Sequence, residues 1–232
     1  PILCRDSLDK VTGKAKYAGD LREPGMLYAR ILRPPAHGAK LINADTSEAK
    51  AIEGAMVIQE GEMIAVLHED PELADYALKK IKAQWEKREA IVDEKSIFDH
   101  LLKVAPAGNI VSEGGNLAEG EKASKTIIEK TYLDGYVSHA TIETHTALAK
   151  VEGGKVTIWA STQSPFGIKE EVASELGVLS KDVHVITPFL GGGFGGKGTN
   201  RQAAEAAKLA KMVGKPIQVA LSRPEEFFYD TF

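Results

Sequence analysis

The fold is decided by residues 183–221, VHVITPFLGGGFGGKGTNRQAAEAAKLAKMVGKPIQVAL. The apolar runs 183–190 and 216–221 have the length of strands. Between them, residues 201–214 carry alanine and leucine at helical spacing and end in glycine, so they predict a helix. A strand, a glycine-rich loop, a helix and a strand in this order are typical of an α/β domain.

The preceding segment has the same order. Residues 155–162 predict a strand, and residues 164–177 predict a helix that Ser164 caps and Gly177 ends. Where successive strands are parallel, both crossovers are expected to be right-handed. The loop that holds Gln163 would then meet the glycine-rich loop at the carboxyl edge of the sheet, where ligands bind in open α/β sheets.

The first half of the chain predicts a small α+β module. Residues 26–33 and 55–67 predict strands, the second segment being folded into two strands around Gly61. Residues 70–87 predict a helix that begins at Asp70, a good cap followed by proline. Its apolar face would consist of the residues at four-residue steps, Leu73, Ala77, Ile81 and Trp85.

Regular periodicity is lost over residues 104–121, which gather glycine, proline and asparagine. This composition predicts a domain boundary near residue 118. Residues 126–139 and 140–154 beyond it predict further strands. We therefore expect one domain over residues 1–117 and the first, incomplete part of another over residues 118–232.

Composition and charge exclude several classes of function. The 232 residues carry a net charge of −4 and are 43% hydrophobic, which allows a sizeable core and favours neither nucleic acid nor an anionic membrane as partner. There is neither an apolar run of the roughly 18 residues that span a membrane nor a signal-peptide pattern, so we expect a cytoplasmic protein. Cys4 is the single cysteine, which excludes an internal disulfide and a cysteine-ligated iron–sulfur cluster within this chain. His139 and His145 do not form a convincing metal pair, so we expect no side chain to ligate a metal directly.

Two nucleotide-binding patterns fit the glycine-rich loop in part. Gly191, Gly193 and Gly196 satisfy G-x-G-x-x-G, and the same loop with Lys197 satisfies G-x-x-x-x-G-K. A P-loop needs a hydroxyl after the lysine to bind magnesium, and this chain has Gly198 there. A dinucleotide fold needs an acid at the end of the next strand, where this chain has Ser-Arg-Pro. A phosphate loop remains an alternative, as does a non-catalytic structural subunit.

Five stretches of the chain resemble the molybdenum-cofactor subunit of molybdenum hydroxylases, the xanthine dehydrogenase and aldehyde oxidase family. They are DKVTGKAKYAGDL (9–21), LYARILRPPAHGAKL (27–41), ATIETHTALA (140–149), STQSPF (161–166) and GGGFGGKG (191–198). The resemblance implies an N-terminal α/β-hammerhead domain over residues 1–117. It also implies that residues 118–232 begin a molybdopterin-binding α/β domain.

The resemblance also implies roles for the two loops. Gln163 is similar to a family glutamine that donates a hydrogen bond to an oxo ligand of molybdenum. Backbone amides around Phe194 would face the pterin dithiolene and the metal's oxygens, and the cofactor-binding residues would be Gly191, Gly192, Gly193, Phe194, Gly195 and Gly196. The cofactor's sulfurs would hold the metal. Each residue has an ordinary alternative: a close strand–helix crossing for the glycines, a satisfied polar residue for Gln163 and a core residue for Phe194.

Glu143 and His145 match a family strand near the cofactor, and structural and functional roles are equally open for them. Lys197 is expected to be solvated or paired. Purine-hydroxylating members have a glutamate after this lysine, whereas Gly198 stands here, which argues against a purine held in their manner.

The implied reaction is the hydroxylation of an aldehyde or N-heterocycle with water-derived oxygen. The implied cofactor is molybdenum–molybdopterin, with a dinucleotide form left open. The implied partners are a C-terminal molybdenum-domain segment, an iron–sulfur subunit and a FAD subunit. The family's general base lies farther downstream, so we expect no residue of this chain to act as the base.

Overall fold

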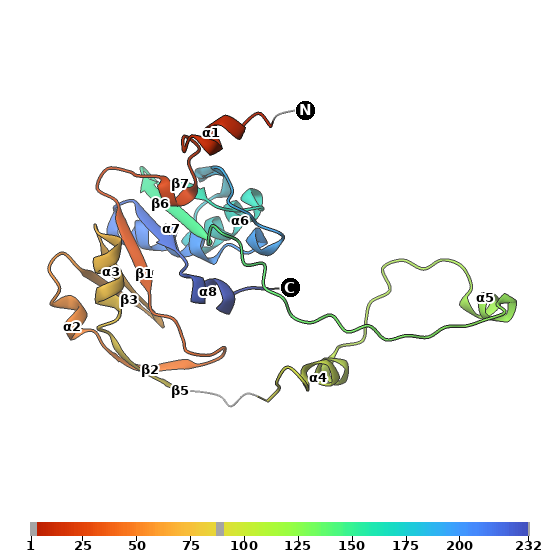
Figure 1. Cartoon of the computed structure of the whole chain (residues 1–232). Helices are drawn as coiled ribbons and strands as arrows, with labels where there is room; N and C mark the ends of the chain where they lie inside the picture. The colour runs from red at the N-terminus through yellow and green to blue at the C-terminus, as the bar shows by residue number, and fades with distance from the viewer. Residues whose placement is uncertain (1–3, 87–90, 232) are drawn as a thin grey trace. The chain divides into compact units, whose positions relative to one another are not determined.

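The computed structural model describes residues 4–86 and 91–231 (Figure 1). The chain forms two compact units, one made of Pro1–Lys87 with Val137–Phe232 and the other of Arg88–Tyr136. The smaller unit has two short helices, α4 (Ile97–Val104) and α5 (Leu117–Ala123), and most of its described side chains are exposed. The larger unit carries both sheets and the glycine-rich loop.

A seven-stranded mixed sheet forms the core of the larger unit. Its strands are β1 (Leu27–Ile31), β3 (Met56–Glu60), β4 (Met63–His68), β6 (Thr146–Glu152), β7 (Lys155–Ala160), β8 (Val183–Ile186) and β9 (Ile217–Ala220). They lie in the order β3-β4-β1-β9-β6-β7-β8. The pairs β1–β9 and β7–β8 are parallel, and the other neighbours are antiparallel. Two further strands, β2 (Lys40–Asp45) and β5 (Lys82–Glu86), form a separate antiparallel pair.

Helices cover both faces of this sheet. On one face, α6 (Pro165–Leu176) and α7 (Arg201–Val213) share a core with six of the strands, and the alanines of α7 allow a close approach. On the other face, α3 (Pro71–Leu78) and α2 (Ser47–Lys50) pack on β4. Ala65 and Leu67 of β4 face the first core, while Ile64 and Val66 face the second. A strand buried on both faces explains its continuous apolar sequence.

The remaining described helices are short. They are α1 (Ser7–Val11), α8 (Arg223–Phe228) and the 3₁₀ turns Ala18–Asp20, Ser180–Asp182 and Gly196–Gly198. Among the described residues, no helix combines the length and the apolar character needed to cross a membrane. The expected mixed α/β architecture is therefore found, with strands from both sides of residue 118 joined in one sheet.

The predicted helix over residues 70–87 is half wrong. It begins as predicted, with Asp70 accepting hydrogen bonds from two amides of the first turn, but it ends at Leu78. Residues Lys82–Glu86 form β5 and pair with β2, and Lys87, the last residue of the predicted helix, lies outside the described residues. Residues four apart lie on the same face of a strand, where side chains alternate, as well as on the same face of a helix. The apolar residues Ile81 and Trp85 therefore fit both structures.

The strand predicted over residues 126–139 is also wrong, because these residues form no strand and β6 begins only at Thr146. Ile127 and Tyr132 are 67% and 87% exposed, so a strand in this segment would have no sheet on which to bury its apolar side chains. The helix at 164–177 is confirmed and ends at Gly177 in the left-handed conformation, but the Ser164 side chain makes no capping hydrogen bond.

The two crossovers have opposite hands. α6 connects β7 to β8, and α7 connects β8 back past β7 and β6 to β9. The three strands run in the same direction, as predicted, but both helices pack on the same face of the sheet. Two connections that run in opposite directions across one face cannot both be right-handed, so that prediction is wrong.

Asp230 ties the end of the larger unit to the start of its second segment. Its carboxylate accepts hydrogen bonds from the Ser138 hydroxyl (2.6 Å), the His139 amide (2.8 Å) and Nδ1 of His139 (2.7 Å). Burial raises the pKa of the Asp230 carboxyl, but these hydrogen bonds outweigh burial and lower the pKa to about 2.

The first prediction concerns the close packing of α7. Ala206 is fully buried against the sheet, so Ala206→Leu should lower the free energy of unfolding by about 1–3 kcal/mol through overpacking. Ala204 on the same helix lines a cavity of about 600 Å³, so Ala204→Leu is the matched control and should cost less. Equal losses of stability in urea titrations of the two variants would contradict this account of the core.

The second prediction concerns pH. A carboxyl whose pKa is lower in the folded state stabilises the fold above its unfolded pKa, near 3.8, and loses this contribution as the pH falls toward 2. The melting temperature of the wild type should therefore fall more steeply between pH 5 and pH 2 than that of Asp230→Asn. Parallel curves for the two proteins would show that Asp230 is not held in this way.

Candidate functional site

The loops that follow β7 and β8 meet at one edge of the sheet. These strands are parallel neighbours, so their carboxyl ends lie side by side. The backbone N–H of Gln163 donates to the Lys197 carbonyl (2.9 Å). The side-chain oxygen of Gln163, Oε1, accepts from the backbone N–H of Gly195 (3.1 Å). The structure thus brings Gln163 and the glycine-rich loop, residues 191–197, together as the order of strands predicts.

This contact orients the Gln163 side chain. Because Oε1 accepts from an amide, the Nε2 group is left as a donor, and it has no partner among the described residues. Gly192 and Phe194 make no hydrogen bond at all within the described part of the chain. Gln163 Nε2 and the backbone amides of Gly192 and Phe194 are therefore unpaired donors at one sheet edge, an arrangement that fits an anionic ligand rich in acceptors.

The glycines of the loop are required by close contacts. A Cβ on Gly191 would lie 2.4 Å from Glu143 Cβ, and one on Gly193 would lie 2.5 Å from the Gln163 amide group. Gly196 is crowded in the same way by the ring of His139. The crowding therefore comes from other loops of the site, and no atom of α7 is among these nearest contacts, so the alternative of a close strand–helix crossing is not supported.

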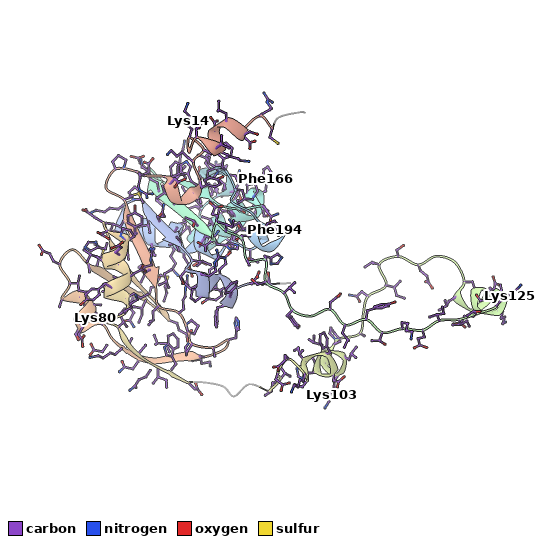
Figure 2. All side chains as sticks on the ribbon, in the orientation of Figure 1. Lys14, Lys80, Lys103, Lys125, Phe166 and Phe194 are labelled. Atoms are coloured by element: carbon purple, nitrogen blue, oxygen red, sulfur yellow. The ribbon has the colours of Figure 1, made fainter. Side chains whose placement is uncertain are left out.

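Phe194 has a strained backbone and an exposed ring. Its φ is +54°, a conformation that is unfavourable for a bulky side chain. The side chain is 76% exposed, so the alternative that Phe194 is a core residue is wrong (Figure 2). Strain of this kind is typical of functional sites, where the surrounding structure holds the residue in place.

A buried set of charges lies beneath the loop. Lys197 is 0% exposed, and its Nζ is 2.8 Å from Glu143 Oε2, so the lysine is paired, one of the two predicted outcomes. His145 Nδ1 is 2.7 Å from Glu226 Oε1, and its Nε2 is 3.2 Å from the Gly196 carbonyl. Each nitrogen of the ring therefore faces an oxygen atom, one of a carboxylate and one of a backbone carbonyl.

Glu226 is a residue of the candidate site that the sequence did not single out. Burial raises the pKa of its carboxyl, but hydrogen bonds from the His145 ring and amide outweigh burial and lower it. The site therefore holds the Lys197–Glu143 ion pair and the hydrogen-bonded pair of His145 and Glu226. Glu226 lies in α8, beyond the last predicted strand, and no spacing in the sequence links it to the loop.

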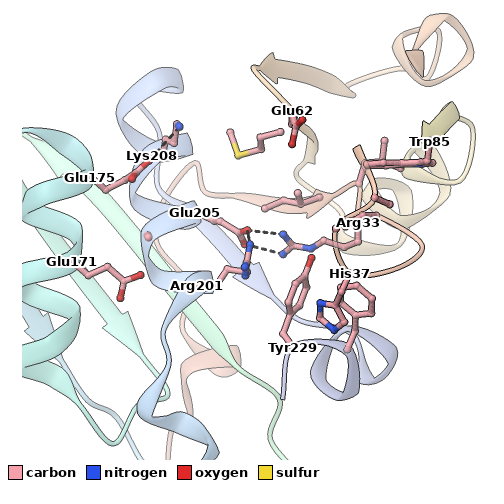
Figure 3. A pocket seen from close by; sticks show the side chains of 18 residues that line it. Arg33, His37, Glu62, Trp85, Glu171, Glu175, Arg201, Glu205, Lys208 and Tyr229 are labelled. Atoms are coloured by element: carbon pink, nitrogen blue, oxygen red, sulfur yellow. Dashed lines mark hydrogen bonds and ion pairs between the residues drawn. The ribbon is translucent and has the colours of Figure 1, made fainter. Parts of the chain in front are cut away.

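A separate hollow of the larger unit lies away from the glycine-rich loop. It measures about 600 Å³ and is lined by Arg33, Glu205 and Tyr229 but by no residue of the glycine-rich loop (Figure 3). Arg33 donates to Glu205 at 2.5 and 2.8 Å and to Glu225 at 2.7 Å, so its charge is already neutralised. Among the described residues, no group of three or more His, Cys, Asp or Glu side chains is placed to hold a metal ion.

Comparison with known proteins identifies the second half of the chain. Residues 103–232 match the model of the molybdopterin cofactor-binding domain family. The chain is 26% identical to the xanthine dehydrogenase molybdenum-binding subunit of Escherichia coli O157:H7, over 96% of this chain and 36% of that protein. It is 29% identical to the nicotinate dehydrogenase large molybdopterin subunit of Eubacterium barkeri, over 95% of this chain and 60% of the relative. The chain thus spans between about a third and three fifths of these relatives.

Solved structures have the same fold. Quinoline 2-oxidoreductase from Pseudomonas putida 86 aligns with a TM-score of 0.79 at 23% identity, over 99% of this chain and 35% of that one. Aldehyde oxidoreductase from Desulfovibrio gigas aligns with a TM-score of 0.79 at 19% identity, over 97% of this chain and 30% of that one. The chain belongs to the molybdopterin cofactor-binding domain family, that of the large subunits of xanthine dehydrogenase-type molybdenum hydroxylases.

Proposed function

We propose that this chain forms the cofactor bed of an oxidoreductase that hydroxylates an aldehyde or N-heterocycle with oxygen from water. The observation that carries the proposal is the set of unpaired donors at one sheet edge, Gln163 Nε2 and the amides of Gly192 and Phe194. A molybdenum–pterin cofactor is anionic and rich in oxygen and sulfur acceptors, so these donors match its chemistry.

Each residue would have a distinct task. Gln163, held by the Gly195 amide, would donate from Nε2 to an oxo ligand of the metal. The amides of the glycine-rich loop would donate to acceptors of the cofactor, and the exposed Phe194 ring would form an apolar wall that limits water. When bound, the cofactor supplies the two-electron oxidation, for which no side chain of this chain is suited.

Other polypeptide segments would complete the enzyme. The chain has one cysteine, so iron–sulfur clusters would be carried by another subunit, and FAD by a further one. A general base and the remaining part of the molybdenum domain would come from segments outside the portion of the relatives that this chain matches. The division into a hammerhead domain over residues 1–117 and a cofactor domain from residue 118 is part of the same proposal.

The phosphate-loop alternative is disfavoured by Lys197. A P-loop lysine must reach the phosphates of a nucleotide. Here Nζ is completely buried and bonded to Glu143 beneath the loop, and Gly198 offers no hydroxyl for magnesium. A purine nucleotide bound by this loop would therefore lack both of its usual contacts.

The experiment that tests the proposal is metal and pterin analysis of the protein purified from cells that make the cofactor. We expect molybdenum and pterin in equal amounts, and reduction of a dye by aldehydes or N-heterocycles in the assembled enzyme. Absence of both metal and pterin, together with thermal protection by ATP or NAD, would favour the phosphate loop. Absence of all three would favour a structural subunit.

A glycine substitution should separate cofactor binding from folding. Gly193→Val would place carbon atoms where the Gln163 amide group lies, so the variant should contain much less pterin while its circular dichroism spectrum is unchanged. Gly198→Ala is the matched control, because a Cβ at Gly198 meets no atom within 4 Å. Normal pterin content in the Gly193→Val protein would count against the loop as the cofactor bed.

Gln163→Glu should remove the Nε2 donor while keeping the hydrogen bond from Gly195 that positions the side chain. A glutamate can still accept from the Gly195 amide but has no N–H to donate. The variant should retain its cofactor and lose about 10²- to 10³-fold in kcat, the usual effect of removing one donor that stabilises developing charge. A kcat equal to that of the wild type would show that Nε2 plays no part in turnover.

A further inference from the structure

One oxygen atom of Glu143 holds both ends of the glycine-rich loop. Glu143 Oε2 accepts from the Gly191 amide (2.8 Å) at the start of the loop and from Lys197 Nζ (2.8 Å) at its end. The Glu143 amide in turn donates to the Gly191 carbonyl (3.2 Å), so these two residues are joined in both directions. The loop is closed on itself through a single carboxylate.

The pair is largely shielded from solvent. The Lys197 side chain is 0% exposed and that of Glu143 is 12% exposed, and Glu143 is the ion-pair partner of Lys197 in the described residues. Removing either partner would leave the other charge buried without compensation, which is strongly unfavourable. The geometry of the loop is therefore coupled to this pair.

The pair is a poor device for stability alone. Glu143 Oε1 is buried and has no hydrogen-bond partner among the described residues. An unsatisfied buried oxygen opposes folding, and buried ion pairs are often no better for stability than apolar side chains of similar shape. The geometric effect of the Glu143 carboxylate is that one oxygen, Oε2, accepts hydrogen bonds from both Gly191 and Lys197.

Lys197 also connects the loop to Gln163. The Lys197 carbonyl accepts from the backbone N–H of Gln163 (2.9 Å), while the Lys197 ammonium is held by Glu143. The loop between these anchors presents Gly192 and Phe194 with unbonded amides. A loop released at residue 197 would be free to turn these amides toward carbonyls of the protein.

We infer that Glu143, acting through Lys197, is a positioning residue that keeps the donors of the glycine-rich loop facing outward. The Glu143 carboxylate contacts the loop at Gly191 and Lys197. The link to cofactor affinity rests on the proposed function, whereas the shape of the loop does not require a cofactor to be present.

The test uses the double variant Glu143→Gln/Lys197→Met. Each single variant leaves one charge of the Lys197–Glu143 pair buried and unpaired and is expected to fold poorly, whereas the double variant removes both charges of this pair. The glutamine amide can still accept from the Gly191 N–H, so only the connection between positions 143 and 197 is lost. Lys208→Met is the control, a lysine-to-methionine change on α7 that breaks ion pairs with Glu60 and Glu175 away from the loop.

Three quantities are measured in the full protein: the melting temperature, the hydrogen–deuterium exchange of residues 189–198 in cofactor-free protein, and the pterin content after expression with cofactor synthesis. The double variant should melt like the wild type, exchange faster at residues 189–198, and bind the cofactor about 10- to 100-fold more weakly, the usual effect of losing an outer support of a cofactor site. The control should match the wild type in exchange and pterin content.

Wild-type exchange in the double variant, or faster exchange with unchanged pterin content, would overturn the positioning role. A double variant with a lowered melting temperature would assign the pair to stability and would also overturn it. If the wild type itself bound no pterin, the proposed function would fail, while the exchange comparison in cofactor-free protein would still decide whether Glu143 shapes the loop.

Discussion

The pairing of β9 with both β1 and β6 is the interaction on which the structure depends. β9 has four residues, three of them buried, and it joins the strands of the first half of the chain to those of the second. Leu27 pairs with Ile217 on one side, and Ala149 pairs with Ile217 on the other. Without this strand, β7 and β8 would have no continuous sheet behind them, and the edge at which their loops meet would be unsupported.

The geometry of the candidate site depends on that sheet edge in three steps. Parallel β7 and β8 bring two loops together, glycine allows the loops to approach to within contact distance, and the buried ion pair closes the glycine-rich loop. The amides of Gly192 and Phe194 are left without a hydrogen-bond partner among the described residues. The proposed cofactor would supply the acceptors that these donors lack.

The sequence was informative where one physical signal dominated. Helical spacing with glycine stops located α6 and α7, and the order of elements placed Gln163 near the loop. It failed where two periods coincided, as at β5, and where the tertiary context decided, as in the hand of the crossovers. The roles of Glu226 and Glu143 could not be predicted, because their contacts join residues far apart in the chain, 145 with 226 and 143 with 197, which no local pattern records.

The smaller unit, Arg88–Tyr136, is an insertion in the sequence between two segments that strand pairing holds together. The segments before and after it share the seven-stranded sheet, and their association does not rely on the covalent connection alone. A cut within residues 91–136 would therefore leave two fragments with complementary strand edges. In engineering terms, this segment is a natural location for a split-protein design, in which the seven-stranded sheet is complete only when both fragments are present.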